Sequence, residues 1–279
     1  MKKKVVYFRV PVLLILAVLT PSACKGSAPQ NDNEVKTVIA GVYGAYPPFN
    51  YTDDNNELIG YELEILKEVD RRLPQYVFEY QKLSGDVLLT SVDAGRVDIG
   101  VCQWEFNVDR AEKYYFSEGY NSYDMYVTVL ENNDTIESMA DLDGKVLGIR
   151  LGGNDYNIAT RYLAAHPEMD ITLFNMPMDD SLTIPNFVNH TYDAILSNPF
   201  NVVTFNLSNL TQLKHVGETV SSSEAHFLLK KTRIEDDIDT LKLLNAIDTA
   251  ILAMKVDGTM ALLYEQEVTS YIKKLAAGL

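Results

Sequence analysis

A single arginine, Arg110, follows a short apolar run in a chain rich in acids, and it stands among side chains suited to hydrogen bonding. Residues 97–120 read VDIGVCQWEFNVDRAEKYYFSEGY, so Gln103, Glu105 and Asn107 lie between the apolar run and the arginine. A guanidinium is planar and permanently charged, and it binds a carboxylate through two parallel hydrogen bonds. The segment is therefore a candidate anion site, with a surface ion pair to a neighbouring acid as the alternative.

The other residue types that carry chemistry are few and scattered. The four histidines lack the spacing of metal ligands, so no metal site is expected: His166, His190, His215 and His226. Cys102 lies in the apolar run with no histidine near it, which is typical of a buried, inert thiol. The sequence has no Walker-type loop and no GxGxxG motif, so no nucleotide or other cofactor is expected.

The composition indicates a globular, acidic protein. The chain has 279 residues, 47% hydrophobic content and a formal net charge of -15, with a pI near 4.6. This length suits one large or two medium domains, and the hydrophobic content is too high for a disordered chain. The excess of acids argues against nucleic acid as a partner and against a peripheral grip on anionic lipid.

The N-terminus has the pattern of an export signal. Residues 1–24 combine a basic start, an apolar stretch too short to span a bilayer, and small residues at the end. Cys24 resembles the acylated cysteine of a bacterial lipobox, although Pro21 stands where leucine is usual; ordinary cleavage is the alternative. Residues 25–36 are polar and predict a flexible tether. We therefore expect an exported protein, in the periplasm or lipid-anchored on the outer face of the cytoplasmic membrane.

Strand-like and helix-like segments alternate along the rest of the chain. Helices are predicted over 62–73, and over 238–255 with a stop at Asp257-Gly258. The short β-branched segments that predict strands are TVIAGVYG (37–44), VDIGVCQ (97–103), MYVTVL (125–130), KVLGIRLG (145–152), YDAILSN (192–198) and HFLLKK (226–231). This alternation predicts an α/β fold.

Six segments occur in the order found in one family of proteins. They are YPPFNYTDDNNELIGYELEILKEV (46–69), SVDAGRVDIGV (91–101), NVDRAEKYYFSEGY (107–120), GKVLGIRLGG (144–153), YDAILSN (192–198) and DGTMALLYEQ (257–266). Each motif is loose alone, but together they resemble the extracellular solute-binding proteins of family 3, the polar amino-acid receptors of ABC importers. The spacing of Gln103, Asn107 and Arg110 resembles the cystine and sulfur amino-acid branch, which implies a neutral polar ligand.

The resemblance implies a two-lobed periplasmic-binding-protein-like fold of type II. Each lobe would be a mixed sheet flanked by helices, and two crossover strands would join the lobes around a ligand cleft. The expected boundaries are 37–127 for the first part of lobe 1, 128–222 for lobe 2 and 223–279 for the completion of lobe 1.

The resemblance also implies roles for individual residues. Arg110 stands where the family's carboxylate-binding arginine stands, and an ion pair with Asp109 or Glu112 is the alternative. Tyr46 matches the aromatic residue that lies against the ligand's side chain, with a plain core role as the alternative. Asn154 matches a family threonine that hydrogen-bonds the carboxylate at a helix start, a position compatible with helix capping.

The sequence departs from the family pattern at three of its expected ligand-binding positions. Asn198 stands where an aspartate usually holds the ligand's ammonium, and Gln103 and Glu105 stand where small hydroxyl residues line the pocket. Burying an ammonium without a counter-charge is costly. Either Glu105 replaces the missing aspartate, which we favour, or the ligand has no amine.

The expected function is capture of a free amino acid by hinge closure, and delivery to permease and ATPase subunits on separate chains. No covalent chemistry is needed, so the protein is not expected to be an enzyme. Two alternatives share the fold: an exported dehydratase of the cyclohexadienyl or arogenate type with Glu105 as general acid, and a ligand-sensing module.

Overall fold

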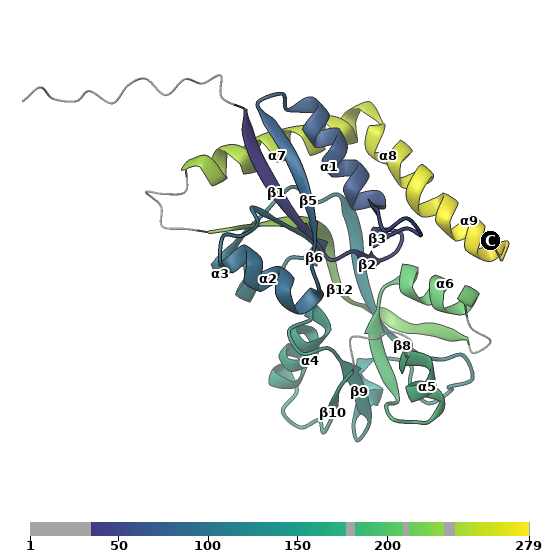
Figure 1. The fold of residues 1–279 in the computed structure, drawn as a ribbon. Helices are drawn as coiled ribbons and strands as arrows, with labels where there is room; N and C mark the ends of the chain where they lie inside the picture. Colours follow the sequence, from purple (N-terminus) through teal and green to yellow (C-terminus); the bar gives the residue numbers. More distant parts are fainter. Residues whose placement is uncertain (1–34, 177–181, 209–211, 232–237, 279) are drawn as a thin grey trace, which may run out of the picture. The chain divides into compact units, whose positions relative to one another are not determined.

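One long β-sheet runs through the part of the chain that the computed structural model describes, residues 35–176, 182–208, 212–231 and 238–278 (Figure 1). Its strands follow the order β10-β9-β11-β8-β12-β6-β1-β5, and β7 pairs with β12. A second small sheet has the order β2-β3-β4. The predicted signal peptide, residues 1–24, and positions 25–34 of the predicted tether lie outside the described residues. The predicted end of the tether at residue 36 is wrong, because Lys36 is the first residue of β1 and pairs with β5.

Strands and helices alternate along the middle of the described chain, as the sequence predicts, between a run of four strands at its start and a run of four helical elements at its end. The strands are β1 (Lys36–Val42), β2 (Ala45–Tyr46), β3 (Asn50–Thr52), β4 (Leu58–Ile59), β5 (Tyr76–Lys82), β6 (Ile99–Glu105), β7 (Tyr114–Phe116), β8 (Asn121–Leu130), β9 (Val146–Ile149), β10 (Thr172–Asn175), β11 (Ala194–Ser197) and β12 (Leu213–Lys230). The helical elements are α1 (Tyr61–Arg72), α2 (Gly85–Asp93), α3 (Val108–Lys113), η1 (Met139–Leu142), α4 (Asn154–Ala165), α5 (Thr183–Val188), α6 (Pro199–Ser208), α7 (Ile238–Asp257), α8 (Thr259–Tyr264), η3 (Glu265–Thr269) and α9 (Ser270–Ala276).

The sheet is mixed, and its pairing follows from which strands are buried. The central strand β6 is apolar along most of its length and buried at nearly every position, as expected for a strand covered on both faces. It pairs with β12 in the antiparallel sense, and β1 pairs parallel with both β5 and β6. β9 pairs parallel with β10 and β11. The predicted α/β fold class is confirmed.

Two large hydrophobic cores lie along this sheet. The first joins β1, β6 and the end of β12 to α1 and α7, and the second joins β8, β9 and β11 to α4. The long strands β8 and β12 pair with each other in the antiparallel sense, and a register shift interrupts their ladder between Val216 and Ser221. The lobe boundaries at 127 and 222 fall within these two strands and stay a prediction.

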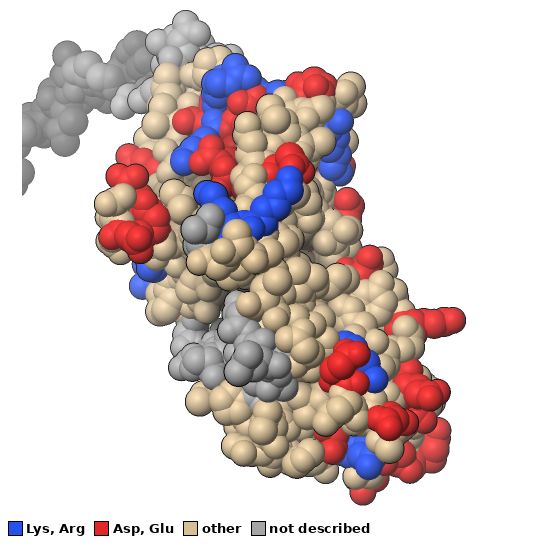
Figure 2. Space-filling model, turned by 90° about the vertical axis from the view of Figure 1, so that its right-hand side faces the viewer, with Lys and Arg blue, Asp and Glu red and all other residues tan. Residues whose placement is uncertain are grey.

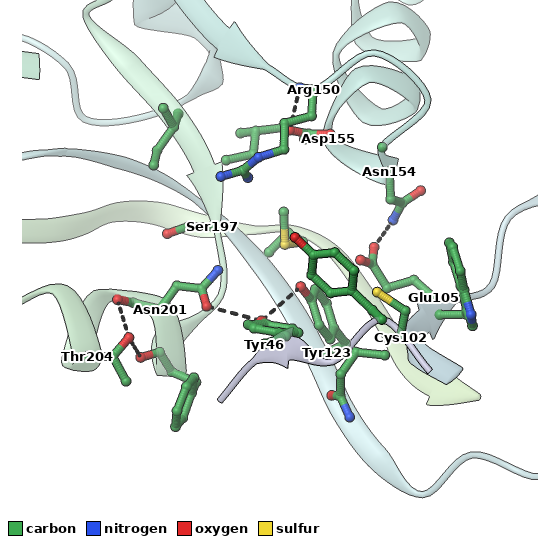
Figure 3. A pocket seen from close by; sticks show the side chains of 18 of the residues that line it. Tyr46, Cys102, Glu105, Tyr123, Arg150, Asn154, Asp155, Ser197, Asn201 and Thr204 are labelled. Atoms are coloured by element: carbon green, nitrogen blue, oxygen red, sulfur yellow. Dashed lines mark hydrogen bonds between the residues drawn. The ribbon is translucent and has the colours of Figure 1, made fainter. Parts of the chain in front are cut away.

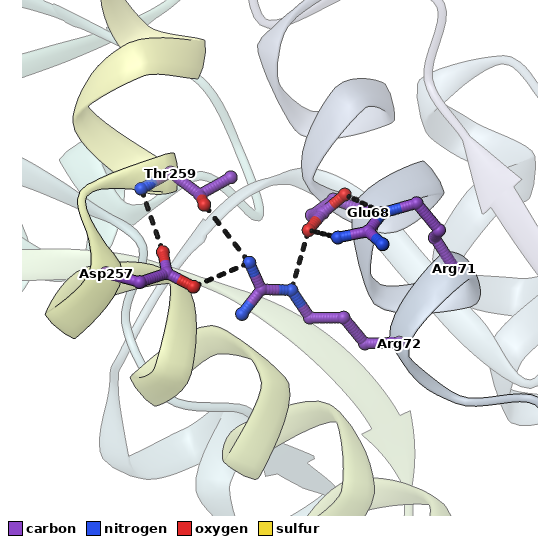
Figure 4. Close-up of polar contacts among 5 residues, drawn as sticks. All are labelled: Glu68, Arg71, Arg72, Asp257 and Thr259. Carbon is purple, nitrogen blue, oxygen red and sulfur yellow. Dashed lines mark hydrogen bonds and ion pairs between the residues drawn. The ribbon is translucent and has the colours of Figure 1, made fainter.

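An ionic cluster joins α1 to the end of α7 and the start of α8 (Figure 4). The guanidinium of Arg72 binds Glu68 Oε1 at 2.7 Å and Asp257 Oδ2 at 2.8 Å. Asp257 also accepts a hydrogen bond from the backbone N–H of Thr259 (3.0 Å). Gly258 between them has φ +83, a left-handed conformation that glycine adopts at low cost. The predicted stop at Asp257-Gly258 is therefore confirmed.

The surface reflects the acidic composition. Figure 2 shows Asp and Glu side chains mixed with Lys and Arg over the upper half of one face and Asp and Glu side chains predominating at its lower right, with a mostly uncharged area beside them. In the described residues, no helix combines the length and the apolar character that a membrane crossing requires.

Candidate ligand-binding site

A cavity of about 510 Å³ opens where the ends of β6, β9 and β11 come together with β2, β8 and α6. Its volume lies in the range of small-molecule sites, roughly 300–1,000 Å³. The polar and charged side chains among its lining residues are Tyr43, Tyr46, Gln103, Glu105, Arg110, Tyr123, Arg150, Asn154, Asp155, Ser197, Asn201, Thr204 and Tyr271. Five of the six predicted ligand-binding residues therefore line one cavity.

Arg110 lies on α3 and extends its guanidinium toward the cavity. Asn107 caps this helix by accepting the backbone N–H of Arg110 at 2.8 Å, which fixes where the side chain starts. The guanidinium donates to the carbonyl oxygens of Glu105 (3.2 Å) and Gly152 (3.3 Å), and it lies 4.9 Å from the centre of the Trp104 ring. Within the described chain, no ion pair joins Arg110 to the acids of its own helix. Its remaining N–H groups leave capacity for a ligand's anion.

Glu105, the last residue of β6, is 8% exposed and directed at the same cavity. Its carboxylate accepts a hydrogen bond from Nδ2 of Asn154, drawn in Figure 3. Burial raises the pKa of Glu105 to about 7, while the nearby charge of Arg110 and the bond from Asn154 oppose that shift. A buried carboxylate with one side-chain donor is poised to accept a cationic partner.

Asn154 is the first residue of α4, and its side chain leaves the helix start. The N-cap of α4 is Gly153, and no side chain caps it. The capping role considered for Asn154 is therefore wrong, because its amide donates to Glu105 instead. Whether Asn154 also contacts a ligand's carboxylate stays a prediction.

Tyr46 lines the cavity from β2 and holds a group of polar side chains together. Its ring packs on Phe49, with 5.1 Å between the ring centres. Its hydroxyl donates to Asn201 Oδ1 (3.1 Å), accepts from Asn198 Nδ2 (3.3 Å) and lies 3.4 Å from the hydroxyl of Tyr123 (Figure 3). Burial raises the pKa of Tyr46 to about 12, so the phenol stays protonated.

Gln103 lines the cavity floor in an unusual backbone conformation, with φ +46. Its backbone N–H donates to the buried carboxylate of Glu62 (2.9 Å), and its Oε1 accepts from Asn121 Nδ2 (3.0 Å). Its Nε2 is buried and makes no hydrogen bond of ordinary geometry within the described residues, but this side chain lies near enough to the Glu62 carboxylate to oppose the rise in the pKa of that group.

Asn198 is the predicted site residue that does not line the cavity. Its Oδ1 accepts the backbone N–H of Asn201 at 2.8 Å at the start of α6, and its Nδ2 donates to Tyr46. It therefore stands behind Tyr46, and its direct contact with a ligand stays a prediction.

Several lining residues are missed by sequence reasoning, notably Arg150 and Asp155. Arg150 directly follows strand β9, and Asp155 lies in the first turn of α4. A signal was available, because ligand sites in α/β sheets gather at the carboxyl ends of strands. Cys102 also lines the cavity, and burial raises the pKa of its thiol, as expected for an unreactive cysteine. No metal-binding group of three or more His, Cys, Asp or Glu side chains is found in the described part of the chain.

The comparison with known proteins places the chain in a family. The sequence profile of the bacterial extracellular solute-binding proteins, family 3, matches residues 38–269, so the chain belongs to this family. The L-cystine-binding protein TcyJ of Bacillus subtilis (strain 168) is 29% identical over 231 residues, 82% of this chain and 86% of that protein. A solved structure described as a putative L-cystine ABC transporter from Listeria monocytogenes is 29% identical with a TM-score of 0.73, covering 84% of this chain and 96% of that one. The predicted family, its cystine branch and the type II periplasmic-binding-protein fold are confirmed.

A third similarity bears on the enzyme alternative. The ancestral amino acid-binding protein AncCDT-1, described as a precursor of cyclohexadienyl dehydratase, is 20% identical with a TM-score of 0.66 and covers 83% of this chain and 94% of that one. At this identity the likeness shows the fold alone. A shared fold does not choose between binding and catalysis, so the choice depends on the site.

Proposed function

We propose that the protein is the substrate-binding component of an ABC importer and that its ligand is L-cystine or a closely related sulfur-containing amino acid. The relatives named for L-cystine support this ligand, and the site agrees with its chemistry. The protein captures the amino acid in the cavity, closes around it and presents the closed form to permease and ATPase subunits on separate chains. In this role it is not an enzyme.

The observation that carries the proposal is the pairing of Arg110 with Glu105 at one cavity. An α-amino acid is a zwitterion, and it needs a cation for its carboxylate and an acceptor for its ammonium. Arg110 supplies the first, and Glu105 supplies the charge that Asn198 lacks. Two hydrogen bonds, Arg110 to Gly152 and Asn154 to Glu105, already join the β6–α3 segment to the β9–α4 segment. A ligand held by Arg110 and Glu105 that also contacts the start of α4 therefore favours the closed arrangement.

The experiment that tests the proposal is calorimetric titration with L-cystine after retained solute has been removed. We expect Arg110→Ala to weaken binding by roughly 2–5 kcal/mol, since the ligand's carboxylate is then buried without its partner. Arg110→Lys should recover only part of the loss, because an ammonium lacks the planar fork. Unchanged affinity of Arg110→Ala for L-cystine would contradict the central role of this residue.

Native mass spectrometry of the protein as purified gives an independent measurement, because such proteins often retain their solute. An α-amino acid as the retained mass supports the proposal. A retained carboxylic acid without an amine contradicts the role given to Glu105.

We further propose that the protein is exported and held at the outer face of the cytoplasmic membrane by acylation of Cys24. The small residues before Cys24 and the polar residues that follow it support this assignment. Cys24→Ala should move the protein from the membrane fraction to the soluble fraction, and the mature wild type should carry the mass of a lipid anchor. If the wild-type protein is found in the soluble fraction and its mass shows no acyl group, the proposed lipid anchor is wrong. The ligand assignment does not depend on this result.

One observation favours a second candidate, a dehydratase acting on a cyclic carboxylate. Glu105 has a pKa near 7 in a cavity that also holds Arg110, and a carboxyl group with such a pKa can serve as a general acid. Incubation with prephenate or arogenate tests this candidate. Turnover that Glu105→Gln abolishes would favour it over transport.

A further inference from the structure

The last described helix, α9, lies beyond the part of the chain that the family profile matches, and it nevertheless lines the cavity. The profile match ends at residue 269, and α9 spans Ser270–Ala276. Tyr271 and Leu275 on this helix are among the lining residues of the cavity. One wall of the site is therefore built by a segment that the family pattern does not describe.

Packing against the core fixes which face of α9 meets the cavity. Val268, just before α9, is fully buried, and Ile272 packs on the first hydrophobic core. Tyr271 and Leu275 are four residues apart, so they share a neighbouring face of the helix. The Tyr271 ring lies 6.0 Å, centre to centre, from the ring of Tyr51 on β3. The π-helical turn η3 leads into α9, and such turns are frequent at functional sites.

The helices α6 and α9 together bound one side of the cavity. They contact each other and lie side by side on the right of Figure 1, whereas α3 and α4 lie on the left. Figure 3 shows Asn201 and Thr204 of α6 on one side of Tyr46. Glu105 and Asn154 lie on the other side of Tyr46 in the same view. The cavity therefore extends from the charged groups, past Tyr46, to α6 and α9.

The two sides of the cavity differ in charge. All of its described charged lining residues belong to the β6–α3 and β9–α4 segments: Glu105, Arg110, Arg150 and Asp155. The described lining residues of α6 and α9 carry no charge: Phe200, Asn201, Thr204, Phe205, Tyr271 and Leu275. Burying a charge without a partner is costly, whereas sulfur atoms and methylene groups pack favourably against aromatic rings. The α6–α9 side is therefore suited to an uncharged part of the ligand.

We propose that α6 and α9 form an uncharged compartment for the sulfur-containing side chain of the ligand, and that Tyr271 and Leu275 contact the part of that chain beyond the sulfur. The inference rests on the proposed function, in which Arg110 and Glu105 hold the amino-acid head of the ligand. It narrows the ligand class to cysteine derivatives whose sulfur carries a further uncharged extension. L-cystine belongs to this class through its disulfide and its second β-carbon.

The first test uses the wild-type protein and two probes that differ only in the length of an uncharged extension. S-methyl-L-cysteine ends one carbon beyond the sulfur, and S-propyl-L-cysteine has two further methylene groups. We expect the propyl probe to bind roughly tenfold more tightly by calorimetry, because its extra methylene groups are buried against Tyr271 and Leu275. Equal affinity for the two probes overturns the inference.

The second test changes the wall. Tyr271→Ala should weaken binding of S-propyl-L-cysteine by roughly fivefold or more and of S-methyl-L-cysteine by less than about twofold. Leu275→Ala should act in the same direction, and Tyr271→Phe should stay close to the wild type because it keeps the ring. Lys274→Ala is the matched control, because Lys274 is an exposed residue of the same helix. An equal loss for both probes shows that α9 only supports the fold, and it overturns the inference.

The outcomes separate this inference from the proposed function. If the wild type binds L-cystine, and binds the methyl and propyl probes with equal affinity, amino-acid capture stands and the role of α9 is wrong. If it binds neither L-cystine nor either probe, the ligand assignment fails and the inference fails with it. Should Tyr271→Ala not fold, Leu275→Ala and the comparison of the two probes on the wild type still decide.

Discussion

Two glutamates, Glu62 and Glu105, are buried close to the cavity floor, and their surroundings differ. Glu62 on α1 is 0% exposed, and Asn50 Nδ2, the Tyr120 hydroxyl and the backbone N–H of Gln103 all donate to its carboxylate. Glu105 is 8% exposed and lines the cavity, with Asn154 as its side-chain donor. Burial raises the pKa of both carboxyl groups.

The difference separates a structural carboxylate from one available to a ligand. Glu62 is surrounded by donors of the protein itself, and through the backbone N–H of Gln103 it holds the end of β6 in place. Glu105 has oxygen lone pairs left over, and they face a space large enough for a small molecule. Burial alone does not identify a carboxylate that binds a ligand. The number of hydrogen-bond donors that the fold supplies to the carboxylate must be counted as well.

The largest expected effect comes from removing the structural acid. Glu62→Ala leaves three buried donors without an acceptor and opens a cavity, so we expect the free energy of unfolding to fall by roughly 3–5 kcal/mol. Glu105→Ala, the matched control, should change it by less than about 1 kcal/mol, because it deprives only the Asn154 amide of an acceptor and lies at an existing cavity. Denaturant unfolding of the ligand-free proteins measures both. Equal losses of unfolding free energy in the two variants would contradict the distinction between a structural Glu62 and a ligand-binding Glu105.

The next effect tests the ligand side of the comparison. Glu105→Gln should weaken L-cystine binding by roughly 2–3 kcal/mol, because a charge-assisted contact with the ammonium is lost. Asn198→Ala should cost less than about 1 kcal/mol, since Asn198 lies behind Tyr46 and caps α6. Calorimetry on the single and double variants measures both losses.

Asn198→Asp in the Glu105→Gln background sharpens this test. If the ammonium lies near both positions, the new carboxylate should recover part of the lost affinity. If Glu105→Gln binds L-cystine as tightly as the wild type, Glu105 has another role.

Sequence patterns predicted the long helices α1 and α7 well, because their burial is periodic, but they predicted the longest strand, β12 (Leu213–Lys230), only near its end, over 226–231. The helix predicted over 62–73 is α1 (Tyr61–Arg72), and the one predicted over 238–255 is α7 (Ile238–Asp257). The two-residue strands β2 and β4 carry no periodic pattern of their own, and their pairing depends on neighbours. Local sequence preference is a poor guide to secondary structure where contacts with distant parts of the chain determine it.

Site residues could be predicted where both the residue type and a position at the end of a strand indicated ligand binding. Arg110 and Glu105 follow or end β6, and both line the cavity. Asn198 differs because it is followed by proline, and Asn-Pro is a typical helix start in which the asparagine side chain turns back to the backbone. That local hydrogen bond competes with a ligand for the same oxygen. Arg150 also follows a strand, β9, but it was missed because the sequence alone does not show which strand ends share one cavity.

The last effect concerns pH, and it distinguishes the two glutamates again. The pKa of Glu105 is raised from about 4.5 to about 7, so between these values the folded protein holds a proton that the unfolded chain releases. The stability contributed by this group is therefore present below about pH 4.5 and is lost as the pH rises through 7. Ligand-free wild type should lose stability over this window by up to about 1.4 kcal/mol per pH unit more than Glu105→Gln.

Binding should change with pH in the opposite direction. An ammonium needs the ionised carboxylate, so at pH 6 most of the Glu105 population must first release its proton, and the affinity for L-cystine should be about tenfold weaker than at pH 8. Glu105→Gln should show little of this dependence. With saturating L-cystine, the extra loss of wild-type stability with rising pH should disappear, because the bound ammonium lowers the pKa of Glu105. The pH dependence that arises from the raised pKa of Glu62 should remain. A wild-type affinity that is flat from pH 6 to 8 would show that Glu105 does not meet the ligand's charge.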